Sequence, residues 1–262
     1  MDDCFHCQDT GAEHPEGVEP LMRQLKSQRL IKIFIGDITE PYVMSETTLV
    51  NASEYFVKAL KHEDSMGTSQ PGVLRFPEDD DFKETWEILL FWLMTQRLPP
   101  CLTVQDDGNP QPEATEPWIR MWVLADKYLV HELQDTVMLE MLRYFDGTFL
   151  ANMDSDAAMA NEMLRISPVD SRLRRLVAEE TIRGLYEEGP SECSLKTEHL
   201  IASDGVPGLS ASLLDAYHDY MKNNKTYVRN HRKDPDARFR AWGEYLVGCP
   251  PMIHWLGEFE GQ

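Results

Sequence analysis

An apolar stripe at residues 82–93 is the feature that most limits what this chain can fold into. Large side chains recur there at steps of four, three, one and three residues: Phe82, Trp86, Leu89, Leu90 and Leu93. This spacing places them on one face of an α-helix, because helical neighbours lie three and four residues apart. Asp81 and Glu84 precede the stripe at capping-box spacing, and Pro99 follows it. The stripe therefore predicts a helix with one strongly buried face that ends near residue 98.

Short strand-like runs lie on either side of a predicted helical pair. Residues 30–35 form a β-branched run that stops at Gly36-Asp37, and residues 41–44 are typical of the returning strand of a hairpin. Residues 73–76 predict another short strand, which Pro77 ends. Between them, residues 47–50 and 53–60 are expected to be short helices, the second with Ser53 as its N-cap.

Helical patterns dominate the rest of the chain. Pro117 suits the first turn of a helix, and the apolar spacing continues through Tyr128 and then from Val130 to Phe145, with Gly147 as a stop. Further helices are expected from Ser167-Pro168 to residue 185 and over residues 209–220, and the apolar residues after Trp242 are expected to dock on the body. The predicted class is α+β, with a mainly helical region over residues 148–262.

The charge balance restricts the partners. Lys and Arg number 25 and Asp and Glu number 45, which gives a formal net charge of −20. Such a chain repels phosphate, so general binding to nucleic acid or to an anionic membrane is not expected. Residues 1–28 are interpreted as a largely disordered acidic tail. The basic segment 222–240 is the exception, with seven Lys or Arg against two Asp.

Cysteine usage and hydropathy predict a protein of the cytoplasm, the nucleus or both. The five cysteines are scattered and odd in number, which does not suit a secreted disulfide framework. The N-terminus lacks the apolar core of a signal peptide. The longest apolar run, residues 88–94, is far shorter than the roughly 20 residues needed to span a bilayer.

Five strings in the same order resemble the BTB/POZ fold. They are LIKIFIG (30–36), TTLVNASEYFVKAL (47–60), LRFPEDD (74–80), FKETWEILLFWLMTQRLP (82–99) and VLADKYLVHELQDTVM (123–138). The details, including SRLRRLV at 171–177, look most like the fungal group of BTB proteins with a helical C-terminal extension. The resemblance implies a BTB/POZ fold over residues 29–147, a small mixed sheet against a helical bundle.

The same resemblance implies a non-enzymatic protein–protein interaction scaffold. It implies a homodimer or a mixed BTB oligomer, or alternatively a substrate adaptor for a cullin-type ubiquitin ligase. The residues that it suggests for contact with proteins are Leu30, Ile31, Ile33, Met44, Lys58, Glu63, Asp64 and Met66. The chain departs from the family at three places: Leu30 replaces an acidic residue, Met44-Ser45-Glu46 replaces a basic pair, and residues 61–66 lack the apolar–x–Glu motif of cullin binders.

The sequence contains no recognisable catalytic motif, and no cofactor is expected. No phosphate-binding glycine loop and no nucleophile elbow occurs in the sequence. His131 to Asp135 resembles half of a zinc-binding H-E-x-x-H motif, but Asp replaces the second histidine. Cys4, His6 and Cys7 could supply half of a zinc site, although we favour an accidental cluster because a structural site needs four ligands.

The basic segment 222–240 leaves a further alternative open. Tyr227, His231 and Phe239 lie among its cations, so it could contact nucleic acid in a transcription-associated nuclear factor. We favour a solvated linker that is attracted to the chain's own acidic body, since the overall field opposes phosphate.

Overall fold

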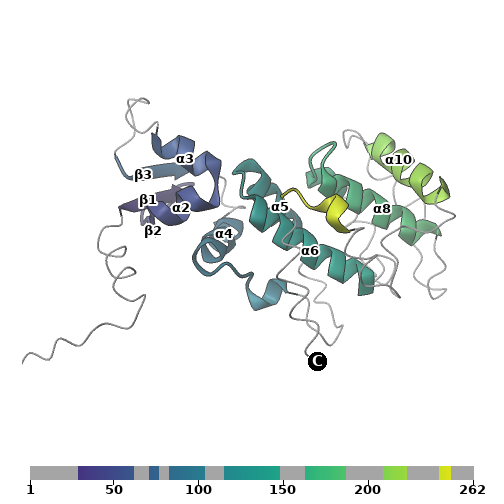
Figure 1. Cartoon of the computed structure of the whole chain (residues 1–262), viewed down its shortest axis with the longest axis horizontal. Coiled ribbons are helices and arrows are strands. Elements are labelled where there is room, and N and C mark those ends of the chain that lie inside the picture. Colours follow the sequence, from purple (N-terminus) through teal and green to yellow (C-terminus); the bar gives the residue numbers. More distant parts are fainter. Residues whose placement is uncertain are drawn as a thin grey trace, which may run out of the picture.

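The protein is α+β and mostly helical, with a small sheet at one end. The computed structural model describes residues 29–61, 71–76, 83–103, 115–147, 163–186, 209–222 and 242–248. Figure 1 shows the sheet at the left-hand end, α5 and α6 in the middle, and α8 and α10 at the opposite end. One continuous cluster of buried apolar residues runs through these parts, from Ile31 in the sheet to Leu246.

The sheet has three strands in the order β2-β1-β3. β1 (Leu30–Ile35) pairs antiparallel with β2 (Tyr42–Ser45) and parallel with β3 (Val73–Phe76). The strands predicted at 30–35 and 73–76 are confirmed, and β2 lies one residue later than expected. Gly36 has a φ of 57° after β1, a left-handed conformation that glycine adopts without steric cost. Side chains along β1 alternate between exposed and buried, so the sheet has one inner and one outer face.

Two short helices follow the hairpin and hold one side of the sheet. α2 (Glu46–Ala52) begins at Ser45, whose hydroxyl accepts a hydrogen bond of 3.1 Å from the Thr48 amide. α3 (Glu54–Lys61) begins after Ser53, whose Oγ accepts from the Tyr55 amide at 3.0 Å. The Ser53 hydroxyl also donates to the carbonyl of Tyr128, 75 residues away. The predicted cap is confirmed, and it also fastens α3 to the end of α5.

The long helices bury the stripes that the sequence predicts. α4 (Lys83–Thr95) ends three residues before the expected position, because Gln96 takes a φ of 56°. A short 3-10 turn, η2 (Pro100–Leu102), then leads to α5 (Thr115–Lys127), where Trp118 Nε1 donates to the Leu102 carbonyl at 2.8 Å. α6 (His131–Gly147) ends at the predicted glycine.

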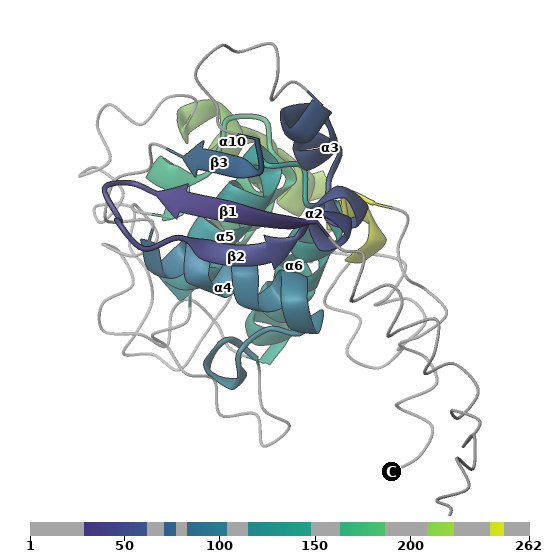
Figure 2. The ribbon, with the colours of Figure 1, turned by 90° about the vertical axis from the view of Figure 1, so that its left-hand side faces the viewer.

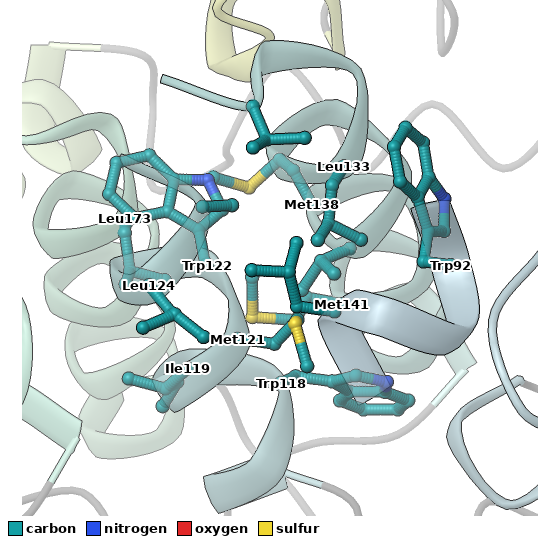
Figure 3. Close-up of a cluster of buried hydrophobic side chains, with 14 of the residues drawn as sticks. Trp92, Trp118, Ile119, Met121, Trp122, Leu124, Leu133, Met138, Met141 and Leu173 are labelled. Atoms are coloured by element: carbon teal, nitrogen blue, oxygen red, sulfur yellow. The ribbon is translucent and has the colours of Figure 1, made fainter. Parts of the chain in front are cut away.

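The C-terminal helices pack on the middle of the molecule. α8 (Arg172–Tyr186) and α10 (Leu209–Lys222) lie where helices were expected, and the 3-10 turn η7 (Gly243–Tyr245) follows. Figure 3 shows the core beneath them, in which side chains of α5, α6 and α8 interdigitate around Trp122, Met138 and Leu173. The buried tryptophans of α4 and α5 belong to the continuous apolar core: Trp86, Trp92, Trp118 and Trp122.

An aromatic cluster joins the sheet to the helices. Phe76 of β3 lies 4.5 Å from Trp86 of α4, measured between ring centroids, and Trp86 lies 4.8 Å from Tyr128. Tyr55 of α3 meets Tyr128 edge-to-face at 4.9 Å. Such ring pairs contribute beyond their buried area, so four elements distant in sequence are held at one point. Among the described residues, no helix is long and apolar enough to cross a membrane.

Candidate protein-interaction surface

The outer face of the sheet carries exposed apolar side chains that the described helices leave uncovered. Figure 2 shows the three strands in front, with the labelled helices behind or beside them. Leu30 is 60% exposed and Val43 is 54% exposed, although both stand in strands. We call this surface the open sheet face and define it by its outward residues: Leu30, Lys32, Phe34, Val43 and Arg75.

The strand register places these five side chains side by side. Lys32 is opposite Val43 on β2, and Phe34 is opposite Arg75 on β3. The Arg75 guanidinium lies over the Phe34 ring, 4.1 Å from its centroid, which is a cation–π contact. The face therefore combines an exposed apolar pair with two cations in a chain whose net charge is −20.

Polar contacts fix the β2 edge beside this face. The Tyr42 hydroxyl donates to Glu87 Oε1 of α4 at 2.6 Å. Burial and then the hydrogen bond and charge of Glu87 raise the pKa of Tyr42 to about 12, so this hydroxyl stays protonated at neutral pH. At the other end of β2, Arg29 and Glu46 form a half-exposed ion pair at 3.6 Å, of the kind that contributes little to stability.

The structure separates the residues that the family resemblance grouped together. Leu30 lies on the open sheet face, whereas Ile31 and Ile33 are 0% exposed and Met44 is 6% exposed. These three point to the inner face because side chains alternate along a strand, so we revise their role from contact residues to core residues. Lys58 is exposed on α3 and pairs with Glu54 at 3.6 Å.

The remaining predicted site residues lie outside the described part of the chain. They are Cys4, His6, Cys7, Glu63, Asp64 and Met66, together with the acidic tail and all but the first residue of the basic segment. Lys32, Val43 and Arg75 were not among the contact residues that the sequence predicted. The alternation of exposed and buried residues in β1 could have indicated the first of them, but the strand register was needed for the other two.

A second candidate feature lies in the middle of the molecule, between α5 and α8 (Figure 1, yellow), where residues 242–248 pack against α6 and α8. We call these residues the docked segment. Asp135 of α6 accepts hydrogen bonds from the backbone amides of Val247 at 2.5 Å and Gly248 at 2.9 Å. Trp242, Tyr245 and Leu246 are buried. The expected docking of this apolar stretch is therefore confirmed for the residues that the structure describes.

Charged side chains on α8 complete this contact. Arg175 Nε donates to Glu179 at 2.9 Å and Nη2 to Glu244 at 3.1 Å, while its guanidinium lies over the Tyr245 ring. The Tyr245 hydroxyl donates to the second oxygen of Glu179. Burial acts to lower the pKa of Arg175, but Glu179, Tyr245 and Glu244 together raise it above its ordinary value. Arg175 therefore stays charged.

Residues 131–135, which resemble half of a zinc motif, make structural contacts in the folded chain. His131 Nδ1 lies 2.9 Å from Gln134 Oε1, and Asp135 holds the docked segment. Burial raises the pKa of Asp135, against the lowering effects of the two backbone amides, Arg172 and His131. Within the described ranges, no three His, Cys, Asp or Glu side chains are grouped as a metal site would need.

The chain matches no protein-family model, and no curated protein is significantly similar to it. Its class is therefore that of an α+β protein with a small mixed sheet and a mostly helical body.

Proposed function

We propose that this protein is a non-enzymatic interaction module that self-associates through its open sheet face. The observation that carries the proposal is the exposure of Leu30 and Val43 on adjacent strands of a face that no described helix covers. Leu30 is opposite Ser45 and Val43 is opposite Lys32, so the two apolar side chains are diagonal neighbours on one face. Covering them with a partner surface removes apolar area from water, which favours association. Exposed strands are also common sites of association between chains.

The element order supports a BTB/POZ fold for residues 29–147. A hairpin, two short helices, a third strand, a long helix, a loop and two helices follow one another along the chain. This is the order that the five sequence strings imply, and β3 pairs in parallel with the first strand of the hairpin. Interaction modules of that family often form homodimers, which agrees with the proposed role of the open sheet face.

Charge sets the salt dependence of the proposed contact. Lys32 and Arg75 lie on the open sheet face together with Leu30 and Val43. In a symmetric dimer the same face of a second copy brings its own two cations toward them, so these charges oppose the contact and the apolar side chains supply the attraction. We therefore expect association to strengthen as salt screens the cations.

The test is the mass of the full chain in solution, measured by sedimentation or light scattering at tens of micromolar. We expect a dimer for the wild type and a monomer for Leu30→Glu/Val43→Glu, because buried carboxylates without partners oppose the contact. Leu214→Glu/Met221→Glu is the matched control, since these two α10 side chains are 66% and 46% exposed.

Two outcomes would overturn the proposal. A wild-type chain that remains monomeric at that concentration excludes self-association. A Leu30→Glu/Val43→Glu variant that remains dimeric shows that the contact lies elsewhere. Circular dichroism of each variant verifies that the fold is retained, which both substitutions permit because the side chains are exposed.

A further inference from the structure

We propose that α6 and α8 form a peptide-recognition site, and that the docked segment is its intramolecular ligand. The ligand class is a linear peptide with the pattern Trp-x-Glu-Tyr-Leu-x-Gly, which is the sequence of residues 242–248 with two positions left open. Binding of such a peptide from another chain requires that the docked segment leave. This inference does not depend on the open sheet face, which lies at the left-hand end of the molecule, away from the docked segment (Figure 1).

The contacts are those of a bound peptide. The docked segment meets two helices and adds no strand or long helix of its own. Asp135 accepts from two successive backbone amides at a bend of the segment, which recognises a backbone shape rather than a particular side chain. Specificity comes from the Tyr245 hydroxyl on Glu179 and from Glu244 on Arg175. Buried Trp242 and Leu246 anchor the two sides of this polar centre.

The side chains that hydrogen-bond to the segment are charged groups that water can solvate when the segment is absent. Asp135 and Glu179 are 4% and 2% exposed while the segment is in place, and both are carboxylates. When the segment leaves, water solvates these charges and Arg175, which offsets part of the cost of exposing the apolar surface that Trp242 and Leu246 cover. The surface is therefore able to exchange one ligand for another.

Each recognition group also limits what can bind. A peptide without the tyrosine hydroxyl leaves Glu179 without one of its donors, which costs binding free energy. A residue with a side chain at the last position is disfavoured, because a Cβ on Gly248 would lie 2.9 Å from Asp135 Oδ2. The site thus selects a small residue after the aromatic and aliphatic anchors.

The direct test uses a fluorescent peptide of residues 241–248 and measures its anisotropy with full-length protein. The receptor is Trp242→Ala/Tyr245→Ala, in which the intramolecular ligand is weakened and α6 and α8 are intact. We expect saturable binding, at least about tenfold tighter than to the wild type, whose attached segment competes within the same molecule. Adding Asp135→Ala to the receptor should weaken binding about tenfold, and adding Glu132→Ala on the exposed side of α6 should not.

The ligand side has its own controls. A peptide with Tyr245→Phe should bind about tenfold more weakly, because it lacks the hydroxyl that Glu179 accepts. The site would also be supported if two chains exchange their docked segments to form a dimer and the free peptide dissociates that dimer. A receptor that is folded but binds no peptide at millimolar concentration would overturn the proposal and leave the segment as a fixed part of the fold.

Hydrogen exchange on the wild-type chain gives a second test if the receptor variant does not fold. An exchangeable ligand predicts that the amides of Val247 and Gly248 open with a lower free energy than those of α6 and α8. Exchange of all of them only through global unfolding would contradict the proposal.

Discussion

The backbone amide of Gly248 donates a hydrogen bond of 2.9 Å to Asp135 Oδ2, across 113 positions of the sequence. Together with the Val247 amide, it occupies both oxygens of one carboxylate on α6. The C-terminal part of the described chain is therefore fastened to the helix that follows the sheet-bearing half. The contribution of this contact to the free energy of unfolding should be measurable with a single substitution in the segment.

Gly248→Ala should destabilise the protein by about 1–3 kcal/mol, because an added Cβ pushes Asp135 from its two donors. The new atom would lie 2.9 Å from Oδ2. Gly243→Ala is the matched control, since no atom lies within 4 Å of a Cβ there. Urea unfolding of both variants measures the difference, and equal midpoints would show that the Asp135 contact adds nothing to stability.

Asp135 should make stability fall as the pH rises above the ordinary range of an aspartate. Burial raises its pKa in the folded chain, so the folded state binds more protons than the unfolded state between the two values. The amides of Val247 and Gly248, and then the charges of Arg172 and His131, oppose this rise in the pKa but do not cancel it. The stability of the wild type minus that of Asp135→Asn, from urea midpoints between acid and neutral pH, should therefore be greatest in acid. A difference that grows with pH would contradict the raised pKa.

Arg183 and Glu180 form an ion pair at 3.2 Å with both side chains buried, and Arg183 also donates to the Phe145 carbonyl at 3.0 Å. Replacing one partner leaves a buried charge, so Arg183→Met should cost about 3–5 kcal/mol. Arg183→Met/Glu180→Gln should cost less than the sum of the single changes. The control is Lys58→Ala, which removes an exposed ion pair with Glu54 and should leave the thermal unfolding temperature unchanged. If the effects of the changes at Glu180 and Arg183 are strictly additive, the two residues are not coupled.

Trp86 should be a principal support of the sheet. It is 0% exposed and contacts the rings of Phe76 and Tyr128. Trp86→Ala should lower the free energy of unfolding by about 3–5 kcal/mol through the cavity it leaves. Phe91→Ala on the exposed side of the same helix is the control and should cost less than about 1 kcal/mol. Similar losses for both would mean that the aromatic cluster is not an anchor.

Local patterns in the sequence indicated most of the elements. The strand at residues 73–76, the cap at Ser53 and the helix stop at Gly147 depend on neighbours within a few positions, and all three are present. The helix of residues 83–95 follows from its stripe, although its end is set by the left-handed conformation of Gln96. Glutamine has no marked preference for this conformation, so the sequence placed the end of the helix three residues too late.

The two candidate surfaces depend on contacts that are distant in sequence. That Ile31 and Met44 face inward while Leu30 and Val43 face outward follows from strand pairing and from the helices behind the sheet. Nothing near Asp135 indicates that Val247 is its partner, because hydrophobic period reports the buried face of an element and not what covers it. The sequence by itself determined the class, the elements and the acidic charge. The tertiary structure decided which side chains remain exposed and which carboxylates hold the docked segment, since both depend on how the elements pack.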